Sequence, residues 1–101
     1  MTVALAPGPR WTYPEGLMKP VRMYSTRVCP YCIRAKMLLN DRGIAFEEID
    51  VSGDHAKRAW LVEATGRRTV PQIFIGDEAI GGYDDLRELQ LSGELDRKLA
   101  A

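Results

Sequence analysis

The chain has few zinc-binding residues and no long apolar run. It has 101 residues, including two cysteines, Cys29 and Cys32, and one histidine, His55, that is distant from them in sequence. Two cysteines cannot complete a four-ligand zinc site within one chain. No apolar run approaches the roughly 20 residues that a membrane-spanning helix requires. A structural zinc site and an integral membrane protein are therefore not expected.

The chain also lacks an excess of charge of either sign. Lys and Arg number 14, as do Asp and Glu, so the formal net charge is zero. Domains that bind nucleic acid usually carry a basic excess, so we do not expect nucleic acid as a partner. Hydrophobic residues make up 46% and charged residues 28%, which is ordinary for one soluble globular domain and argues against wholesale disorder.

Residues 1–19 differ from the rest of the chain. Pro and Gly interrupt them repeatedly, and no hydrophobic period of a strand or a helix survives. The segment has neither the long apolar stretch of a signal peptide nor the Arg- and Ser-rich composition of a transit peptide. We therefore expect a flexible N-terminal extension over residues 1–19, one domain over residues 20–101, and location in the cytoplasm.

Hydrophobic periodicity and turn residues predict alternating strands and helices after the extension. The opening strand-helix-strand unit requires two parallel strands joined by a right-handed crossover. The expected elements are a strand at 21–25, a helix at 30–40, a strand at 44–51, a helix from Ser52 or Asp54 to Thr65, strands at 70–75 and 79–81, a helix from Asp84 or Asp85 to near Gly93, and a last half-helix with Leu95 and Leu99. Ile33, Met37 and Leu38 follow helical spacing in the first helix, and Ala56, Ala59, Trp60 and Ala64 share one face of the second.

The two cysteines lie where the first helix is predicted to begin. Pro30 suits the first helical position, which places Cys29 at the N-cap, beside unpaired N–H groups and the positive end of the helix dipole. Both favour a thiolate, and such thiolates have pKa values of about 3.5–7.5, against about 8.5 for a free cysteine. Cys32 follows one turn later and can attack a mixed disulfide formed on Cys29. We therefore predict Cys29 as the nucleophile and Cys32 as the resolving thiol.

The sequence around these cysteines is basic. No acidic residue occurs between Glu15 and Asp41, whereas Arg27, Arg34 and Lys36 are cationic. A positive field would stabilise the Cys29 thiolate and favour an anionic substrate. The alternative is that Arg34 and Lys36 only solvate the outer face of the helix. A Cys-x-x-Cys pair between a strand and a helix predicts a redox centre, and a metal or cluster site shared between chains is the alternative.

Three motifs resemble the signatures of dithiol glutaredoxins. They are Cys29-Pro30-Tyr31-Cys32, Thr69-Val70-Pro71 and Gly81-Gly82-Tyr83-Asp84-Asp85-Leu86. Over about residues 20–100, their order and spacing are most similar to those of small bacterial glutaredoxins of the glutaredoxin 3 type. The resemblance implies a thioredoxin-like α/β fold, with a four-stranded mixed sheet flanked by helices in the order β-α-β-α-β-β-α. It also implies a binding site for glutathione as the reducing cosubstrate.

The resemblance further implies how glutathione would be held. Val70 would pair with its cysteinyl backbone, next to a cis Pro71. The N–H of Tyr83 and the carboxylate of Asp84 would take the γ-glutamyl end, and Tyr31 would flank the tripeptide. The alternatives are that Asp84 only caps a helix and that Tyr31 is only an exposed aromatic residue. The full implied set is Arg27, Tyr31, Thr69, Val70, Pro71, Gly82, Tyr83 and Asp84.

One position departs from the family pattern. Members often carry Lys three residues before the first cysteine, where it meets the glycine carboxylate of glutathione, but Thr26 occupies that position here. Arg27 is the nearest substitute. Arg58 and Arg68 are the other candidate cations.

Three functions follow from these residues and the resemblance. The first is a monomeric glutathione-dependent oxidoreductase that needs no metal and reduces protein disulfides and glutathione mixed disulfides, with ribonucleotide reductase among the possible partners. The second is an iron–sulfur carrier in which Cys29 of two chains and two glutathione thiolates hold a cluster; the resemblance argues against it, since cluster-binding relatives often have a smaller residue than Pro30. The third, an electron donor served by a flavoprotein reductase, leaves the glutathione signatures without a purpose.

Overall fold

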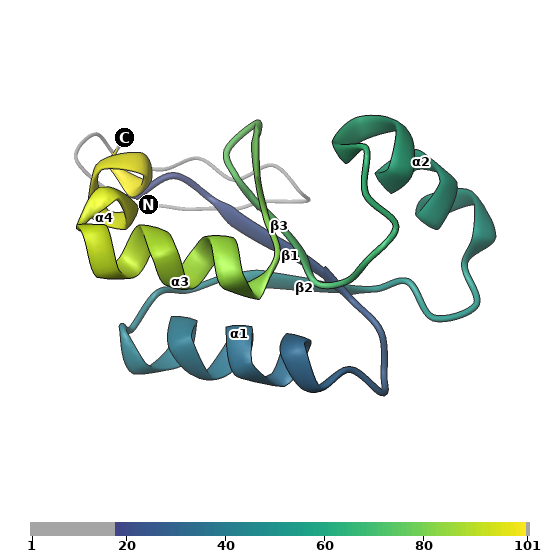
Figure 1. The fold of residues 1–101 in the computed structure, drawn as a ribbon, viewed down its shortest axis with the longest axis horizontal. Helices are drawn as coiled ribbons and strands as arrows, with labels where there is room; N and C mark the ends of the chain where they lie inside the picture. Colours follow the sequence, from purple (N-terminus) through teal and green to yellow (C-terminus); the bar gives the residue numbers. More distant parts are fainter. Residues whose placement is uncertain (1–17, 101) are drawn as a thin grey trace, which may run out of the picture.

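A computed structural model describes residues 18–100 of the chain. Four strands form one sheet in the order β2-β1-β3-β4, in which β1 is parallel to β2 and antiparallel to β3, and β3 is antiparallel to β4. The order of elements and the mixed sheet confirm the sequence prediction (Figure 1). The elements are β1 (Val21–Ser25), α1 (Pro30–Asp41), β2 (Glu47–Asp50), α2 (His55–Thr65), β3 (Gln72–Ile75), β4 (Glu78–Gly81), α3 (Tyr83–Ser92) and α4 (Glu94–Leu99).

The sheet separates two apolar clusters. Alternation along β1 directs Met23 to one face and Tyr24 to the other, because successive side chains of a strand point to opposite faces. The larger cluster joins β1 and β3 to α1, α3 and α4, and it includes the buried Leu39 and Leu86. The smaller cluster joins the other face to α2 through Leu61. In Figure 1, α1 and α3 accordingly lie together on one side, with α2 apart from them.

The second strand is shorter than the sequence predicted. It begins at Glu47 instead of residue 44, because the preceding residues terminate α1. Gly43 adopts φ 68°, its N–H donates to Asn40, and the N–H of Ile44 donates to the carbonyl of Leu39. These two bonds form a Schellman motif, in which an apolar residue after the glycine packs back on the helix. Ile44 is buried by this role and is not available to the strand.

The apolar residues at helical spacing are not all in the core. In α1 the buried residues are Cys32, Ala35 and Leu39, and Leu38 packs partly buried against the same cluster, whereas Ile33 and Met37 are exposed. Both sets follow helical spacing, and the sheet accepts only one of them. In α2 the one buried residue is Leu61, whereas Ala56, Ala59 and Ala64 are exposed and Trp60 is partly exposed against Tyr24 and Phe74. Small alanines offer little apolar area, so their spacing was a poor guide to burial.

Two further boundaries shift at the glycine and proline positions. β3 begins at Gln72 instead of residue 70, after a cis peptide bond between Val70 and Pro71. The N-cap of α3 is Gly82, and neither Asp84 nor Asp85 fills that position.

The expected extension lies outside the described residues except for Met18 and Lys19. Met18 bridges Ala100, and the N–H of Lys19 donates to the carbonyl of Leu99 at 2.7 Å. These two residues therefore pair with the end of α4. Among residues 18–100, no helix is long and apolar enough to cross a membrane.

Candidate active site

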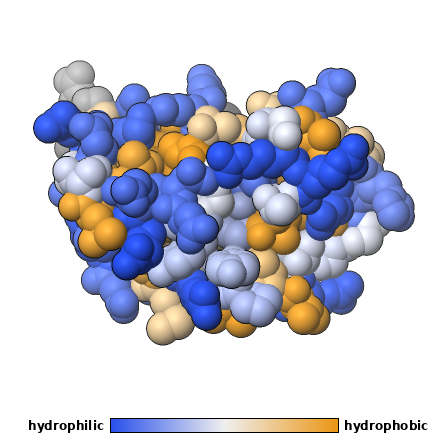
Figure 2. Space-filling view, viewed as in Figure 1, coloured by the Kyte–Doolittle hydropathy of each residue, from blue (hydrophilic) through white to orange (hydrophobic). Residues whose placement is uncertain are grey.

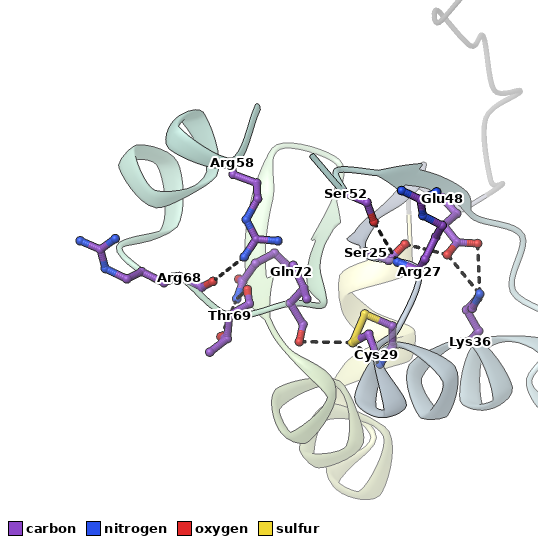
Figure 3. Close-up of a disulfide and its surroundings, with 12 residues drawn as sticks. Ser25, Arg27, Cys29, Lys36, Glu48, Ser52, Arg58, Arg68, Thr69 and Gln72 are labelled. Carbon is purple, nitrogen blue, oxygen red and sulfur yellow. Dashed lines mark hydrogen bonds and ion pairs between the residues drawn. A yellow bond between two sulfur atoms is a disulfide. The ribbon is translucent and has the colours of Figure 1, made fainter. Parts of the chain in front are cut away.

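The reactive pair lies at the start of α1. Cys29 is the N-cap with extended backbone angles, Pro30 is the first helical residue, and the N–H of Cys32 donates to Cys29 Sγ at 3.0 Å. The two sulfurs form a disulfide, drawn in yellow in Figure 3. Both cysteines are buried, with 7% of Cys29 and 1% of Cys32 exposed. In the reduced form, the same N–H and the helix N-terminus favour a thiolate on Cys29.

The segment that contains the cis peptide bond faces this pair. Cys29 Sγ lies 3.7 Å from the carbonyl oxygen of Val70. The buried amide of Gln72 donates to the carbonyl of Thr69 at 2.9 Å and so fixes the turn that precedes β3. Val70 is therefore held beside the nucleophile and outside the ladder of β3, with its backbone next to the sulfur.

A cavity of about 160 Å³ is lined by Val70, the residue whose carbonyl faces Cys29 Sγ. Its walls come from the start of α1, from the turn before β3 and from the start of α3, where the rings of Tyr31 and Tyr83 lie 6.4 Å apart. Seven of the eight residues that the resemblance implied line this one cavity, and Arg27 does not. The seven are Tyr31, Thr69, Val70, Pro71, Gly82, Tyr83 and Asp84.

Two wall residues, Arg67 and Asp85, were missed as site residues by the sequence reasoning. Asp85 accepts from the N–H of Gly82 at 2.9 Å and from Arg67 Nη1 at 2.8 Å. The hydrogen bond from Arg67 lowers the pKa of the Asp85 carboxyl below its usual range. The available signal was the position of Arg67, two residues before the Thr69 motif. Its partner on α3 is 18 residues away, which no local pattern reveals.

A second hollow of about 170 Å³ adjoins the first and is rich in cations. Arg58, Arg67 and Arg68 line it together with Thr69 and Val70. Arg58 Nη2 donates to the carbonyl of Arg68 at 3.2 Å, which ties α2 to the turn before β3. Two of the three candidate cations for a carboxylate therefore lie on this side of the disulfide.

Arg27 lies on the opposite side. Its backbone N–H donates to Ser52 Oγ at 2.9 Å, and Figure 3 shows it across the disulfide from Arg58 and Arg68. The pKa of the Asp50 carboxyl is lowered mainly by a hydrogen bond from the N–H of Ser52, and the charge of Arg27 lowers it slightly further. Arg27 therefore borders the reactive loop, but it lines neither hollow.

The expected positive field around the cysteines is partly neutralised. Lys36 Nζ lies 3.1 Å from a carboxylate oxygen of Glu48, which also accepts from the buried hydroxyl of Ser25 at 2.7 Å. The Ser25 bond is the main cause of the lowered pKa of Glu48, and Lys36 lowers it further. The guanidinium of Arg34 lies 5.2 Å from the centre of the Tyr31 ring. Lys36 is therefore paired with β2, and Arg34 covers an aromatic wall of the cavity.

The arrangement fits thiol chemistry. Within residues 18–100, no three His, Cys, Asp or Glu side chains are grouped to hold a metal ion. The site instead combines two sulfurs, a helix N-terminus, the backbone of Val70 and a cavity with charged side chains in its walls. This arrangement can exchange a disulfide beside a cavity that has polar and charged walls.

Comparisons with known proteins agree with this geometry. The glutaredoxin family profile matches residues 21–80. The chain is 50% identical over 84 residues to "Glutaredoxin" of Pseudomonas aeruginosa, covering 83% of this chain and all of the relative. It is 48% identical over 79 residues to "Glutaredoxin 3" of Escherichia coli K12, covering 78% and 95%. The crystal structure of a buckwheat glutaredoxin–glutathione complex is similar, with TM-score 0.76, 37% identity, and 80% and 76% of the two chains covered.

Proposed function

The chain belongs to the glutaredoxin family, with its thioredoxin-like fold and glutathione-dependent thiol-disulfide oxidoreductase activity, and we propose that Cys29 is its nucleophile and Cys32 its resolving thiol. The observation that supports this assignment is the N–H of Cys32, which donates to Cys29 Sγ at the first turn of α1. A donor there stabilises negative charge on Cys29 and not on Cys32. Cys32 is the more buried of the two, which keeps it from incoming substrates.

The proposed reaction begins on a glutathione mixed disulfide. The Cys29 thiolate attacks the glutathione sulfur, a bond forms between Cys29 and glutathione, and the substrate leaves as a thiolate. A second glutathione thiolate then attacks the glutathione sulfur of this adduct, the bond to Cys29 breaks, and the products are glutathione disulfide and the Cys29 thiolate. Alternatively, Cys32 displaces glutathione and forms the intramolecular disulfide, which two glutathiones later reduce.

We propose that the cavity beside Cys29 receives glutathione. Val70 offers its N–H and carbonyl to the cysteinyl unit, and the start of α3 offers the N–H of Tyr83 to the γ-glutamyl carboxylate. Asp84 is exposed at the cavity wall and pairs with the ammonium of that unit. The support is the shared cavity of these residues and the likeness to a glutaredoxin solved with glutathione.

We place the glycine carboxylate in the second hollow, near Arg58 and Arg68. These residues share its walls with Thr69 and Val70, whereas Arg27 lies on the other side of the disulfide. The resemblance implied that Arg27 contacts glutathione. In this proposal Arg27 does not contact glutathione and only adds positive charge to the loop before Cys29. Substitution of Arg58 by Ala should raise the KM for glutathione more than the same substitution of Arg27.

The physiological substrates proposed are glutathionylated and disulfide-containing proteins, with ribonucleotide reductase as one possibility. We also propose that the protein acts as a monomer in the cytoplasm. The iron–sulfur alternative is not taken further, because no observation on residues 18–100 favours it over thiol chemistry.

Reduction of a glutathionylated peptide by Cys32→Ser, with glutathione as sole reductant, tests the assignment. We expect the variant to keep turnover, because Cys29 and the glutathione cavity remain. Cys29→Ser is the matched variant and should lose turnover. Activity retained by Cys29→Ser contradicts the proposed roles. Activity lost by Cys32→Ser, while the wild type is active, contradicts direct release by glutathione and means that the reaction runs through the intramolecular disulfide.

A further inference from the structure

Large apolar side chains are exposed around the nucleophile more than elsewhere on the described surface. Seven large hydrophobic residues among 18–100 are exposed, and four of them fall between residues 28 and 37. One of the four, Tyr31, lines the cavity already described. The other three have no role so far: Val28 is 90% exposed, Ile33 53% and Met37 58%. We refer to Val28, Ile33 and Met37 as the α1 stripe.

Within the α1 stripe, Val28 precedes the helix, and Ile33 and Met37 lie on a face of α1 that turns away from the glutathione cavity. Ile33 and Met37 are four residues apart and therefore share one helix face. Tyr31 precedes Ile33 by two residues, which turns it by about 200° to the other flank of α1, where it meets Tyr83. Lys36, which pairs with Glu48 of β2, borders Ile33 and Met37 on one side, and Arg34, which lies over the Tyr31 ring, borders them on the other. In Figure 2, apolar side chains interrupt the polar surface along the lower edge of the view, where Figure 1 places α1.

The fold does not require apolar residues at these positions. The packing of α1 against the sheet uses Cys32, Ala35 and Leu39. Isoleucine is also a weaker helix former than lysine or glutamate, which would suit an exposed helix position better. Exposed apolar side chains grouped on one face commonly mark a protein contact.

We propose that the α1 stripe binds apolar side chains next to the cysteine of a protein substrate. The inference rests on the proposed function. During exchange a substrate sulfur must approach Cys29, so the substrate chain must cover the surface around it. Glutathione fills the Tyr31 side, which leaves the α1 stripe, beginning at the adjacent Val28, as the free apolar surface.

The dimensions suit a short extended segment. Met37 follows Cys29 by eight residues, which is about 12 Å along a helix. An extended peptide advances about 3.3 Å per residue, so about four residues beside the substrate cysteine span the α1 stripe. Lys36 at one edge of Ile33 and Met37 is paired with Glu48, and Arg34 at the other edge lies over the Tyr31 ring, so test peptides of equal charge are needed to isolate the apolar contact.

Two synthetic peptides test the preference. Each has 12 residues and one glutathionylated cysteine. In one peptide the four residues on each side of this cysteine are Leu or Val, and in the other they are Ser or Thr. With glutathione as reductant, wild-type protein should show a kcat/KM about tenfold higher for the apolar peptide. The variant with Ile33→Ser and Met37→Ser should bring the two values within about twofold of each other. Both proteins should reduce glutathionylated cysteamine, which is too small to reach the α1 stripe, at equal rates.

Leu91→Ser is the matched control, because Leu91 is 66% exposed on α3 and lies far along that helix from Tyr83. Leu91→Ser should leave the ratio of kcat/KM for the apolar and polar peptides unchanged. Met37→Gln alone should lower this ratio in part. The inference is overturned if wild-type protein does not distinguish the peptides or if the double variant loses turnover of glutathionylated cysteamine to the same extent as turnover of the apolar peptide. It is also overturned if sedimentation shows a dimer for the wild type and a monomer for the double variant. A wild type inactive on glutathionylated cysteamine overturns the proposed function, on which the inference rests.

Discussion

Replacement of Asp85 by Ala should weaken both the start of α3 and the glutathione cavity. The carboxylate accepts from the N–H of Gly82 at 2.9 Å and from Arg67 at 2.8 Å. Loss of a helix-capping bond costs about 1 kcal/mol, and loss of a partly exposed ion pair costs about 0.2–1 kcal/mol. The free energy of unfolding should therefore fall by about 1–2 kcal/mol, or about 5–15 °C in Tm for a domain of this size.

Two matched variants separate the two bonds. Arg67→Ala removes only the ion pair and should cost less than about 1 kcal/mol. Asp85→Asn keeps an oxygen that can accept from Gly82 and should resemble Arg67→Ala. Since Gly82 and its neighbours line the cavity, Asp85→Ala should also raise the KM for glutathione by about threefold or more.

The pH dependence supplies an independent check on Asp85. Its folded pKa lies below the unfolded value of about 3.9, so its stabilisation is present above about pH 4 and is lost as pH falls through the folded pKa. The free energy of unfolding of Asp85→Asn should not show this decrease at low pH. Thermal melts between pH 2 and pH 7 measure the stability of each variant. Kinetics at neutral pH measure its KM for glutathione. Equal stabilities of Asp85→Ala and Arg67→Ala, or an unchanged KM, would refute the reasoning.

Three further substitutions test the surroundings of the site. Gly81→Ala should cost about 1–3 kcal/mol in denaturant unfolding, because φ is 110° there and a Cβ would collide with the Asp85 carboxylate; a neutral result contradicts the described turn. Leu39→Ala should cost about 2–5 kcal/mol, since Leu39 is fully buried, and a loss below 1 kcal/mol would oppose its place in the core. Ser25→Ala should raise the pKa of Glu48 in an NMR titration, because it removes the main bond that lowers that pKa; an unchanged value refutes the cause.

Features set by neighbouring residues could be read from the sequence. Pro30 after Cys29 predicted the N-cap and the first turn of α1, and both are observed. Gly76 predicted the hairpin between β3 and β4, where it takes a positive φ. In each case the chemistry of one or two residues restricts the backbone to one conformation.

Features that depend on distant partners could not be read in this way. Apolar residues follow helical spacing on two faces of α1, and only the position of the sheet decides that Leu39 is buried and Met37 exposed. Ile44 looks like a strand residue, but the turn at Gly43 folds it back on α1. The ion pair between Arg67 and Asp85 likewise arises only when the chain brings the two turns together.

The hydrogen bond from Cys32 to Cys29 links two equilibria that are usually measured separately. The side chain of Cys29 caps α1, and no acidic residue lies in the first turn of this helix. A thiolate accepts the N–H more strongly than a disulfide sulfur does, so reduction strengthens the start of α1. In a closed thermodynamic cycle, the free energy that stabilises the reduced helix also favours reduction of the disulfide. Conformational stability and reduction potential in this protein are therefore coupled through a single backbone N–H.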